Sequence, residues 1–311
     1  MTKPLPPSFV LAEHLTQARS MGLPVVALES AVITHGLPAP HNLALAREME
    51  AEVRAHGATP ATIALLNGRV HIGLTDEQLT LLGETAHTRK ISLRDVGIAL
   101  AGNLSGGTTV AATLYAAAQA GIRVFATGGI GGVHRNAPLD VSTDLVQLGR
   151  SPLVVVCAGA KAILDLPATR EMLETWGVPV IGYQTDEFPG FFTRTSGLPV
   201  DERVETPVAV ARIALSAWAA GLESAILLVV PPPVETAMPA DEMEAAIQNA
   251  LEAAETAGIH GAAATPFLLQ RVNELTGGES LRANLALLKN NARVAAQVAK
   301  AMSGAKHIGV Y

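Results

Sequence analysis

Short β-branched apolar runs alternate with longer segments rich in Ala, Leu and Glu along most of the chain. The apolar runs predict strands over Pro24–Leu28, Thr62–Leu66, Val70–Ile72, Arg123–Ala126, Pro152–Val156, Val178–Tyr183 and Ala225–Val230. The longer segments predict helices over Asn42–His56, Thr75–Leu82, Val110–Ala120, Ala168–Thr175, Pro207–Ala220, Pro239–Ala257, Phe267–Leu275 and Ser280–Met302. Strands separated by helices of this length indicate βαβ crossovers. The pattern therefore predicts an α/β protein whose mainly parallel sheet is covered by helices on both faces.

The chain shows no internal repeat, no low-complexity tract and no linker that would mark a domain boundary. We therefore expect one domain over residues 1–311, with an N-terminal arm over about residues 1–20. The helical C-terminal part is expected to pack across this domain or against a neighbouring subunit.

The composition narrows the classes of partner. Only 16% of the residues are charged and 4% are aromatic, which suits closely packed parallel-sheet layers. The net charge of −6 argues against nucleic acid or a membrane surface as partner, because a phosphate backbone must be met by clustered Lys and Arg. A local phosphate pocket stays possible on this evidence.

The cysteine content and the N-terminal residues indicate the cellular compartment in which the protein is expected. Cys157 is the only cysteine, which excludes an intrachain disulfide and a CxxC zinc site. The segment Met1–Pro7 has no basic region followed by an apolar one, so we expect no signal peptide. The most apolar stretch, Val208–Leu222, contains Arg212 and is too short to span a bilayer. We therefore expect a cytoplasmic protein.

One lysine follows a β-branched run directly. The run Val154–Val156 continues through Gly159 to Lys161, and α/β proteins place their chemistry where a strand ends in small residues. Lys161 is thus a candidate amine nucleophile, the alternative being a solvated lysine at the start of a helix. A second strand that ends in glycines, Val124–Arg135, lies just upstream. Two such loops indicate one shared pocket.

A carboxylate ends another apolar strand. Glu29 follows Val25–Leu28, where an apolar surrounding raises the pKa of a carboxyl group and suits a general acid. A capping or salt-bridged glutamate is the alternative. The nearby His35 lies in a turn-forming loop, and the sequence leaves open whether it faces a pocket or the surface.

The glycine-rich loop does not match a dinucleotide fingerprint. Read from Gly129, His134 stands where the third glycine belongs, and read from Gly128, Ile130 stands where the second belongs. We interpret these glycines as allowing close approach to a ligand and directing His134 and Arg135 into a cleft. A structural role for His134 stays open.

Two hydroxyl-rich segments could bind ions. Asp140–Asp144 groups two carboxylates with two hydroxyls, as hard divalent cations prefer, although Ser142 or Thr143 could instead cap a helix. Gly106–Val110 is expected to open a helix whose free N–H groups attract an anion such as phosphate. Lys90 and Arg94 would add positive charge there.

Taken together, these segments resemble the pseudouridine-5′-phosphate glycosidases, the family that includes the indigoidine-pathway A protein. The similarity runs in order from about residue 20 to residue 300. The matching blocks are Ala27–Ser30, Ile33–Gly36, Gly57–Ala64, Ser92–Asp95, Thr108–Ala111, Phe125–Arg135, Val155–Lys161, Thr265–Leu269, Ser280–Asn284 and Asn290–Ala292.

The resemblance implies an activity and an assembly. Such enzymes reversibly cleave the C–C glycosidic bond of pseudouridine 5′-phosphate to give uracil and ribose 5-phosphate. They use Mn²⁺ or another divalent cation such as Mg²⁺, and they form homotrimers with a three-layer α/β/α core.

The resemblance also implies roles for single residues. Lys161 would form an imine with C1′ of the sugar, Glu29 would donate protons, and Asp140 would hold the metal. Further residues would contact the substrate: Lys90, Thr109, Val110, His134, Ser142, Thr143, Asp144 and Asn284.

Some positions depart from the family pattern. Val230–Pro233 replaces a usual Asn-Pro-x-Pro, a common lysine is absent from Gly261–Ala264, and Asn136 replaces a common glycine. None of these departures removes a proposed catalytic group, and they bear on phosphate or base affinity and on the exact substrate.

Three other functions are weighed against the glycosidase: a class I aldolase-like Schiff-base lyase on another sugar phosphate, a nicotinamide-dependent dehydrogenase, and a non-catalytic scaffold or ligand-binding protein. Release of uracil distinguishes the glycosidase from the lyase, and the failed fingerprint speaks against the dehydrogenase.

Overall fold

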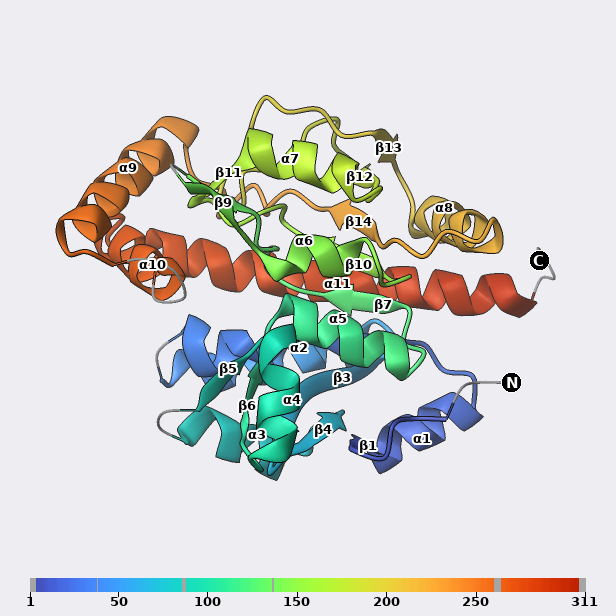
Figure 1. Cartoon of the computed structure of the whole chain (residues 1–311). Coiled ribbons are helices and arrows are strands. Elements are labelled where there is room, and N and C mark those ends of the chain that lie inside the picture. Colours follow the sequence, from blue (N-terminus) through green and yellow to red (C-terminus); the bar gives the residue numbers. More distant parts are fainter. Residues whose placement is uncertain (1–3, 38, 86–87, 136, 260–263, 308–311) are drawn as a thin grey trace.

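A computed structural model describes residues 4–37, 39–85, 88–135, 137–259 and 264–307 (Figure 1). The strands are β1 (Phe9–Leu11), β2 (Val25–Leu28), β3 (Thr59–Leu66), β4 (Arg69–Ile72), β5 (Arg89–Ile91), β6 (Gly106–Thr108), β7 (Val124–Ala126), β8 (Val133–His134), β9 (Ala137–Val141), β10 (Val154–Cys157), β11 (Leu164–Asp165), β12 (Val180–Tyr183), β13 (Glu202–Val204) and β14 (Ile226–Val229). The helices are α1 (Glu13–Ser20), the π-helix η1 (Val32–Gly36), α2 (His41–Ala55), α3 (Asp76–Glu84), α4 (Leu93–Ala101), α5 (Val110–Gln119), α6 (Thr143–Leu148), α7 (Leu166–Thr175), α8 (Pro207–Ala219), α9 (Ala240–Thr256), α10 (Ala264–Leu275) and α11 (Glu279–His307).

The main sheet has eleven strands within the described residues. Its principal order is β1-β4-β3-β2-β7-β10-β14-β12-β13. Strand β6 also pairs with β3, and β5 pairs with β6. All pairs are parallel except those of β3 with β4 and with β6. Strands β11, β8 and β9 form a small antiparallel sheet. The central strands are parallel neighbours, so their carboxyl ends meet at one edge.

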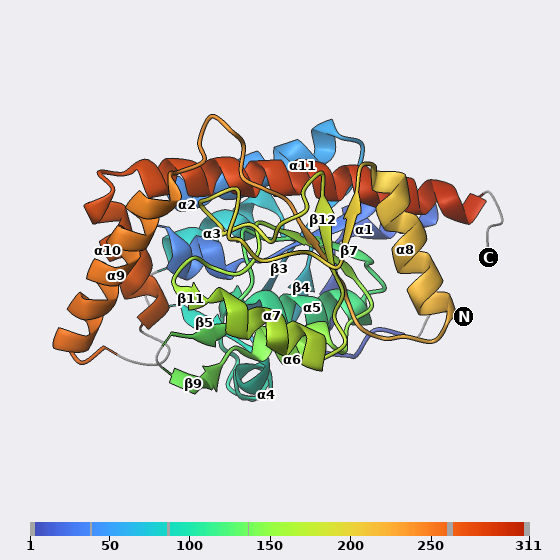
Figure 2. The same ribbon diagram turned by 90° about the horizontal axis from the view of Figure 1, so that it is seen from above.

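Helices cover both faces of the main sheet. Figure 2 shows α11 and α2 along one face and α5, α6 and α7 along the other. On the first face α11 packs against α2 and α8, and it also contacts β2, β7 and β10. The predicted three-layer α/β/α arrangement with a mainly parallel sheet is confirmed.

The central strands carry the core. Each residue of Val154–Cys157 and of Ile226–Val229 is at most 1% exposed. A strand buried on both faces needs apolar side chains at every position rather than at alternate ones. These continuous β-branched runs are the reason that the sequence predicts the central strands correctly.

The sequence pattern missed the short elements. Residues 9–20, expected within an N-terminal arm, form β1 and α1, and β1 pairs with β4. Gly106 and Gly107, expected to open a helix, lie in strand β6. A Cβ at Gly106 would lie 2.0 Å from the carbonyl oxygen of Arg89, so the glycines permit the close approach of strands. A strand of three residues shows too little alternation to be recognised.

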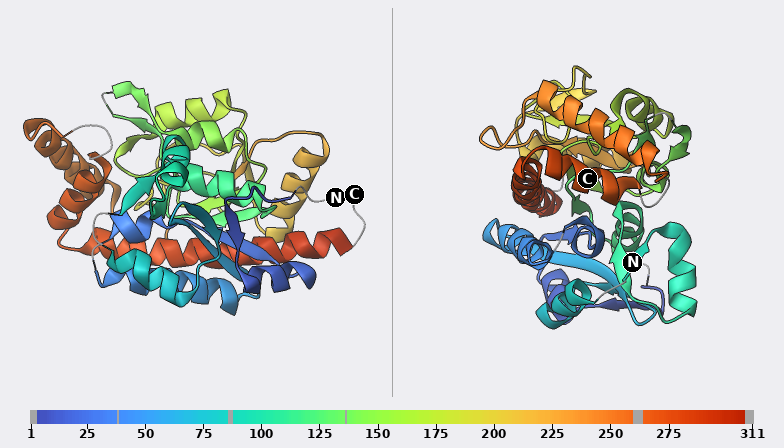
Figure 3. Two further views of the ribbon diagram at one scale, coloured as in Figure 1. Left: turned by 60° about the horizontal axis from the view of Figure 1, so that its bottom comes forward. Right: turned by 90° about the vertical axis from the view of Figure 1, so that its left-hand side faces the viewer.

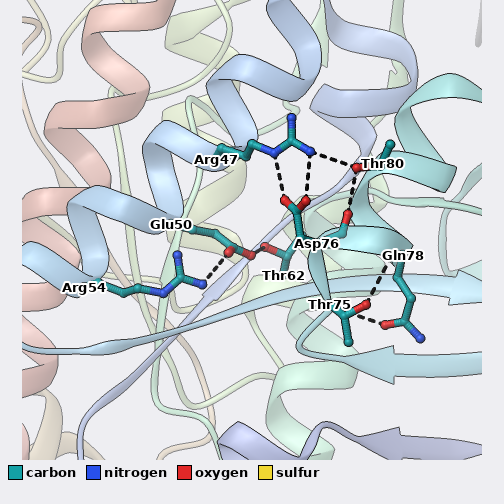
Figure 4. Close-up of polar contacts among 8 residues, drawn as sticks. All are labelled: Arg47, Glu50, Arg54, Thr62, Thr75, Asp76, Gln78 and Thr80. Atoms are coloured by element: carbon teal, nitrogen blue, oxygen red, sulfur yellow. Dashed lines mark hydrogen bonds and ion pairs between the residues drawn. The ribbon is translucent and has the colours of Figure 1, made fainter.

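Polar contacts hold helix α2 against its neighbours (Figure 4). The guanidinium of Arg47 donates to both oxygens of Asp76 on α3, at 2.8 and 3.1 Å. Beneath it, the buried carboxylate of Glu50 accepts from the Thr62 hydroxyl of β3 at 2.6 Å and from Arg54 at 2.7 Å. Exposed ion pairs contribute little, whereas a buried carboxylate must keep its partners. The Glu50–Thr62 bond therefore adds a buried polar contact between α2 and β3 to the apolar packing of Leu45, Met49 and Val53.

Helices α9 and α10 lie together at one end of the molecule, as both the cartoon and its further views show (Figures 1 and 3). Within the part of the chain that the structure describes, no helix has the length and apolar character needed to cross a membrane.

Candidate active site

Three neighbouring strands end at the same edge of the sheet. Strand β7 lies between β2 and β10, with Leu28 opposite Ala126 and Ala126 opposite Val156. The next residue of β2 is Glu29 and the next residue of β7 is Thr127, whose hydroxyl donates a short hydrogen bond to the Glu29 carboxylate. The sheet register thus places the candidate acid beside a buried hydroxyl.

The two glycine-containing loops pair beyond the strands. Ile130 forms a parallel bridge with Ala160, and the N–H of Lys161 donates to the carbonyl of Ile130 at 3.1 Å. Gly159 adopts φ +90°, and a Cβ there would lie 2.6 Å from the carbonyl oxygen of Pro189. Only glycine suits this position. The loops therefore fix Lys161 through backbone pairing, and the expectation of one shared pocket is confirmed.

Two adjoining cavities meet at this sheet edge. The larger, about 460 Å³, is lined mainly by polar and charged side chains, and we call it the polar cavity. The smaller, about 70 Å³, is lined by as many apolar as polar side chains, and we call it the apolar cavity because Phe191, Leu269 and Leu288 line it and not the polar cavity. Both are lined by Glu29, Ala31, Lys90, Lys161 and Thr265. The candidate acid and both lysines therefore face the boundary between a polar and an apolar space.

The predicted site residues gather around these cavities. The polar cavity contains all of them except Asn284: Glu29, Lys90, Thr109, Val110, His134, Asp140, Ser142, Thr143, Asp144 and Lys161. Asn284, on α11, lines the apolar cavity with Phe191, Leu269 and Leu288. The structure therefore brings together side chains from β2 to α11 that lie far apart in sequence.

The surroundings of Glu29 act on its carboxyl group in opposite directions. Burial, the largest effect, raises its pKa, and the negative charge of Asp144 adds to the rise. The positive charges of Lys161 and Lys90 and the hydrogen bond from Thr127 lower it. The net effect is a raised pKa, which is the property that a proton donor at neutral pH requires.

Lys90 is the second amine at this boundary. Burial lowers the pKa of its ammonium group, and the nearby charge of Lys161 lowers it further, against the attraction of Asp144 and Glu29. The repulsion from the Lys161 ammonium group thus adds to burial in favouring the neutral form of the Lys90 amine. Such an environment suits a lysine nucleophile.

The carboxylate of Asp144 is held by the protein backbone rather than left open for a bound ion or substrate. Its carboxylate accepts from the N–H of Ala111 at 2.9 Å and from the N–H of Gly131 at 2.8 Å. It thereby ties the start of α5 to the glycine loop. The expected anion at this helix start is thus a carboxylate of the protein itself. Ser142 caps α6, so the capping interpretation of this segment is confirmed for Ser142.

The described residues offer few ligands for a metal ion. Asp140 lies in β9 and is exposed, and Asp144 is already bonded to two N–H groups. Across the described ranges, no three His, Cys, Asp or Glu side chains gather closely enough to hold an ion. Asp140 is therefore the exposed carboxylate of this segment at the polar cavity, whereas Asp144 is buried and bonded to two backbone N–H groups.

The structure also shows where the basic residues Arg135 and His35 lie relative to the two cavities. Arg135 was expected to point into the same cleft, but it pairs with Glu244 of α9 at 2.5 and 3.0 Å and lines a separate cavity. His35, left open by the sequence, lines the apolar cavity, and its Nδ1 lies 2.7 Å from the Thr34 hydroxyl. Burial, with a smaller effect of Lys90, lowers the pKa of His35.

Sequence reasoning missed Thr127, Phe191 and Asn291. Thr127 follows a predicted strand, and that position was a usable signal. Phe191 lies between elements, where no pattern points to a site. Asn291 belongs to a matched block but had no assigned role, since only the tertiary contacts of α11 reveal one.

Of the departures from the family pattern, only Val230–Pro233 is fully described, and none of its residues lines either cavity. Val230 pairs with Cys157 through a 2.8 Å N–H to carbonyl bond, and the Pro232 carbonyl accepts from Arg194. Asn136 and residues 261–263 of the Ala-rich segment lie outside the described residues.

Comparison with known proteins agrees with this geometry. The family model described as "Indigoidine synthase A like protein" matches residues 14–301. The pseudouridine-5′-phosphate glycosidase of Herpetosiphon aurantiacus is 55% identical over 94% of this chain and 97% of that protein. The protein of the same name from Methylobacterium nodulans is 52% identical over 97% of this chain and 90% of that protein.

Two solved structures share the fold. The prealnumycin C-glycosynthase AlnA, solved in complex with ribulose 5-phosphate, has a TM-score of 0.89 at 39% identity and covers 96% of this chain and 98% of its own. An indigoidine synthase A-like protein of Thermotoga maritima has a TM-score of 0.87 at 35% identity, covering 97% and 100%. The chain belongs to the indigoidine synthase A-like family, the family of the pseudouridine-5′-phosphate glycosidases.

Proposed function

We propose that this protein is an enzyme that reversibly cleaves the C–C glycosidic bond of pseudouridine 5′-phosphate to uracil and ribose 5-phosphate. One observation carries the proposal: Lys161 and Glu29 lie where a polar and an apolar cavity meet. A nucleotide has the same two halves, a charged sugar phosphate and a flat base. The relatives named above act on this substrate according to their names, and a related C-glycosynthase binds a pentulose phosphate.

The polar cavity suits the sugar phosphate. Its wall carries Arg89, Lys90 and Arg94, and Arg89 is already paired with Asp95 at 2.7 Å. Arg94 lies 4.0 Å from the same carboxylate and has an 82% exposed side chain, so it can turn toward a phosphate. We therefore propose that the phosphate binds on the α4 side of the polar cavity, with C1′ toward Lys161.

The apolar cavity suits the base. Phe191, Leu269 and Leu288 supply apolar surface, and the amide of Asn284 can both donate and accept. Uracil presents alternating N–H and carbonyl groups at its edge, which an amide matches. The base therefore lies on the α11 side, with C5 near Glu29.

The chemistry begins with opening of the ribose ring. The neutral amine of Lys161 bonds to C1′ as the C1′–O4′ bond breaks, and the proton that the nitrogen then gives up goes to O4′, which leaves the nitrogen its electron pair. Protonation of uracil at C5 by Glu29 then prepares the carbon leaving group. The nitrogen electron pair forms the C1′=N bond while the C1′–C5 pair returns to the uracil ring.

Water completes the reaction. Its oxygen bonds to C1′ of the iminium ion, the C1′–N bond breaks, and Lys161 is released with ribose 5-phosphate. The overall balance is one substrate and one water to one uracil and one ribose 5-phosphate. Glu29 must give and regain protons in this sequence, which is why its raised pKa matters.

We also propose a divalent cation, Mn²⁺ or Mg²⁺, at Asp140. Such ions are often held by one or two carboxylates, several waters and substrate phosphate, and the exposed carboxylate of Asp140 at the wall of the polar cavity fits that mode. When bound, the cation would neutralise phosphate charge. No step above depends on it.

For the assembly and compartment we propose a cytoplasmic homotrimer, as the family resemblance implies. Leu139 is 96% exposed in β9, beside Asp140, and Ile98 is 53% exposed on α4. Strand β9 and helix α4 also carry Asp140 and Arg94 of the polar cavity, so a subunit contact through Leu139 and Ile98 would lie beside the site. Light scattering of the native protein and of Leu139→Asp tests it, and a native monomer contradicts it.

The decisive experiment traps the imine. The protein is incubated with ribose 5-phosphate and borohydride, digested, and analysed by mass spectrometry. We expect a pentose-phosphate adduct on the Lys161 peptide that is absent in Lys161→Ala. The matched variant Lys90→Met removes the other pocket amine and should keep the adduct on Lys161. An adduct on Lys90, or none, contradicts the proposed nucleophile.

Product analysis addresses the main alternative. Native protein should release uracil from pseudouridine 5′-phosphate, and Lys161→Ala should lose at least about 10³-fold of that rate. Imine formation without uracil release would instead support a Schiff-base lyase for another sugar phosphate.

A further inference from the structure

One face of helix α11 runs along the candidate active site. Asn284 and Leu288 line the apolar cavity, and Asn291 follows at the next turn on the same face. Helix α11 also contacts β2, β7 and β10, the three strands whose ends carry the site. This helix is therefore the element best placed to fix the strand ends from one side.

Asn291 makes that contact through its amide. Its Nδ2 donates to the carbonyl of Thr127 at 2.9 Å and to that of Gly128 at 3.4 Å. The side chain is fully buried, and its Oδ1 has no hydrogen-bond partner among the described residues. A buried unpaired acceptor costs on the order of 1–3 kcal/mol. An apolar side chain would avoid that penalty, so the two donated bonds are the reason for an asparagine here.

Thr127 is held at each of its polar groups. Its N–H donates to the carbonyl of Val156 at 3.0 Å, its carbonyl accepts from Asn291, and its hydroxyl donates to Glu29. The residue is 0% exposed. The direction of the hydroxyl toward Glu29 therefore depends on two backbone anchors, one from strand β10 and one from helix α11.

We propose that Asn291 is a positioning residue, which anchors the Thr127 carbonyl so that the Thr127 hydroxyl stays hydrogen-bonded to Glu29. The inference deepens the proposed function, since it rests on Glu29 as the proton donor. Asn291 itself lines neither cavity and acts only through Thr127.

The charged groups around Glu29 determine how loss of the Thr127–Glu29 hydrogen bond changes the pKa of Glu29. Lys161 follows β10, Lys90 lies in β5, and Asp144 lies in α6. None of the three changes when Asn291 is replaced. A hydrogen bond to the carboxylate favours its charged form, so loss of the Thr127 bond leaves burial less opposed and raises the pKa of Glu29 further.

The experiment reads the ionisation of Glu29 without turnover. Protein labelled with ¹³C at the glutamate carboxyl groups is titrated by NMR, and the Glu29 signal is assigned by its loss in Glu29→Gln. We expect Asn291→Leu and Thr127→Val each to move the Glu29 midpoint to higher pH. In Thr127→Val, adding Asn291→Leu should move it no further, because Asn291 acts through Thr127.

A matched control separates positioning from general loss of stability. Asn42 is also buried, donates to two carbonyls, those of Ile33 at 3.1 Å and Gly83 at 3.2 Å, and has an unpaired Oδ1. Asn42→Leu should lower the melting temperature as Asn291→Leu does, without moving the Glu29 midpoint.

Kinetics add a second readout. In Asn291→Leu we expect kcat for uracil release to fall on the order of 10- to 100-fold and the basic limb of its pH profile to shift to higher pH. An unchanged Glu29 midpoint in Asn291→Leu overturns the inference, even if activity falls. Full activity of Glu29→Gln would instead overturn the proposed role of Glu29, and the titration would still report whether Asn291 acts on it.

Discussion

Ile130 and Ala160 lie opposite each other in a parallel bridge just beyond the ends of β7 and β10. The bridge extends the sheet pairing into two glycine-containing loops, and the next residue, Lys161, donates its N–H to the Ile130 carbonyl. A lysine fixed by backbone pairing keeps its stem in place while its amine meets the substrate. The precision of the proposed nucleophile thus depends on how closely these loops approach each other.

A methyl group at Gly159 should disturb that approach. Gly159 has φ +90°, and its added Cβ would lie 2.6 Å from the Pro189 carbonyl oxygen. We expect Gly159→Ala to lose about 1–3 kcal/mol of unfolding free energy and to reduce the yield of the borohydride adduct. Urea unfolding and quantitative mass spectrometry measure the two effects.

Gly97 offers the matched control. It lies exposed in helix α4, and a Cβ there would meet nothing within 4 Å. Gly97→Ala should stabilise the protein by up to about 1 kcal/mol, since alanine favours a helix. Equal stability of the two alanine variants would show that the loop has no such constraint.

The sequence predicted the parts of the fold whose signal is local and continuous. The buried run Val154–Val156 and the amphipathic segment that became α11 are examples, because each is long enough to show its period. Strand β6 was predicted as a helix start, because Gly106 and Gly107 are explained only by the neighbouring strand they approach.

The residues of the candidate site likewise fall into those that the sequence could predict and those that it could not. Residues next to strand ends, such as Glu29 and Lys161, could be found from the sequence. Asn291 could not be given a role, because its partners are about 160 residues away in the chain. Arg135 was predicted to face the cleft, but its ion pair with Glu244 of α9 holds it at a separate cavity.

Replacement of Glu29 should change activity and stability with opposite signs at neutral pH. Burial raises the pKa of Glu29 in the folded state, so the folded protein holds this proton more tightly than the unfolded chain does. Its contribution to stability is then present below the unfolded pKa of about 4.3 and is lost as pH rises through the folded pKa. Glu29→Gln removes that loss.

We therefore expect Glu29→Gln to lose about 10²- to 10⁴-fold in kcat while its melting temperature rises relative to native protein as pH increases. Scanning calorimetry across the pH range checks the second effect. A melting-temperature difference that is independent of pH would contradict a raised pKa in the folded state.

The two cavities should separate the binding of the two products. In the synthetic direction, Asn284→Ala removes an amide from the apolar cavity and should raise KM for uracil about 10-fold, with KM for ribose 5-phosphate nearly unchanged. Arg94→Ala removes a cation from the polar cavity and should do the reverse. Steady-state kinetics with one substrate varied at a time measure both, and equal effects on the two KM values would contradict the assignment of the halves.

The carboxylates of Asp140 and Asp144 should respond to replacement in different ways, although only three residues separate them. Asp144 is buried and accepts from two backbone N–H groups, so Asp144→Asn should lower the unfolding free energy by about 1–3 kcal/mol. Asp140 is exposed and without that role, so Asp140→Asn should leave the unfolding free energy within about 0.5 kcal/mol.

Metal binding, unlike stability, should depend on Asp140. If Asp140 supplies the protein ligand, Asp140→Asn should weaken Mn²⁺ binding in the presence of ribose 5-phosphate at least about 10-fold, as measured by electron paramagnetic resonance of free Mn²⁺. The exposed carboxylate of Asp241, on α9, lines neither cavity and serves as control, and Asp241→Asn should bind Mn²⁺ as native protein does. Unchanged Mn²⁺ affinity in Asp140→Asn would show that the ion is held elsewhere, because a carboxamide replaces the negative charge that attracts a hard cation.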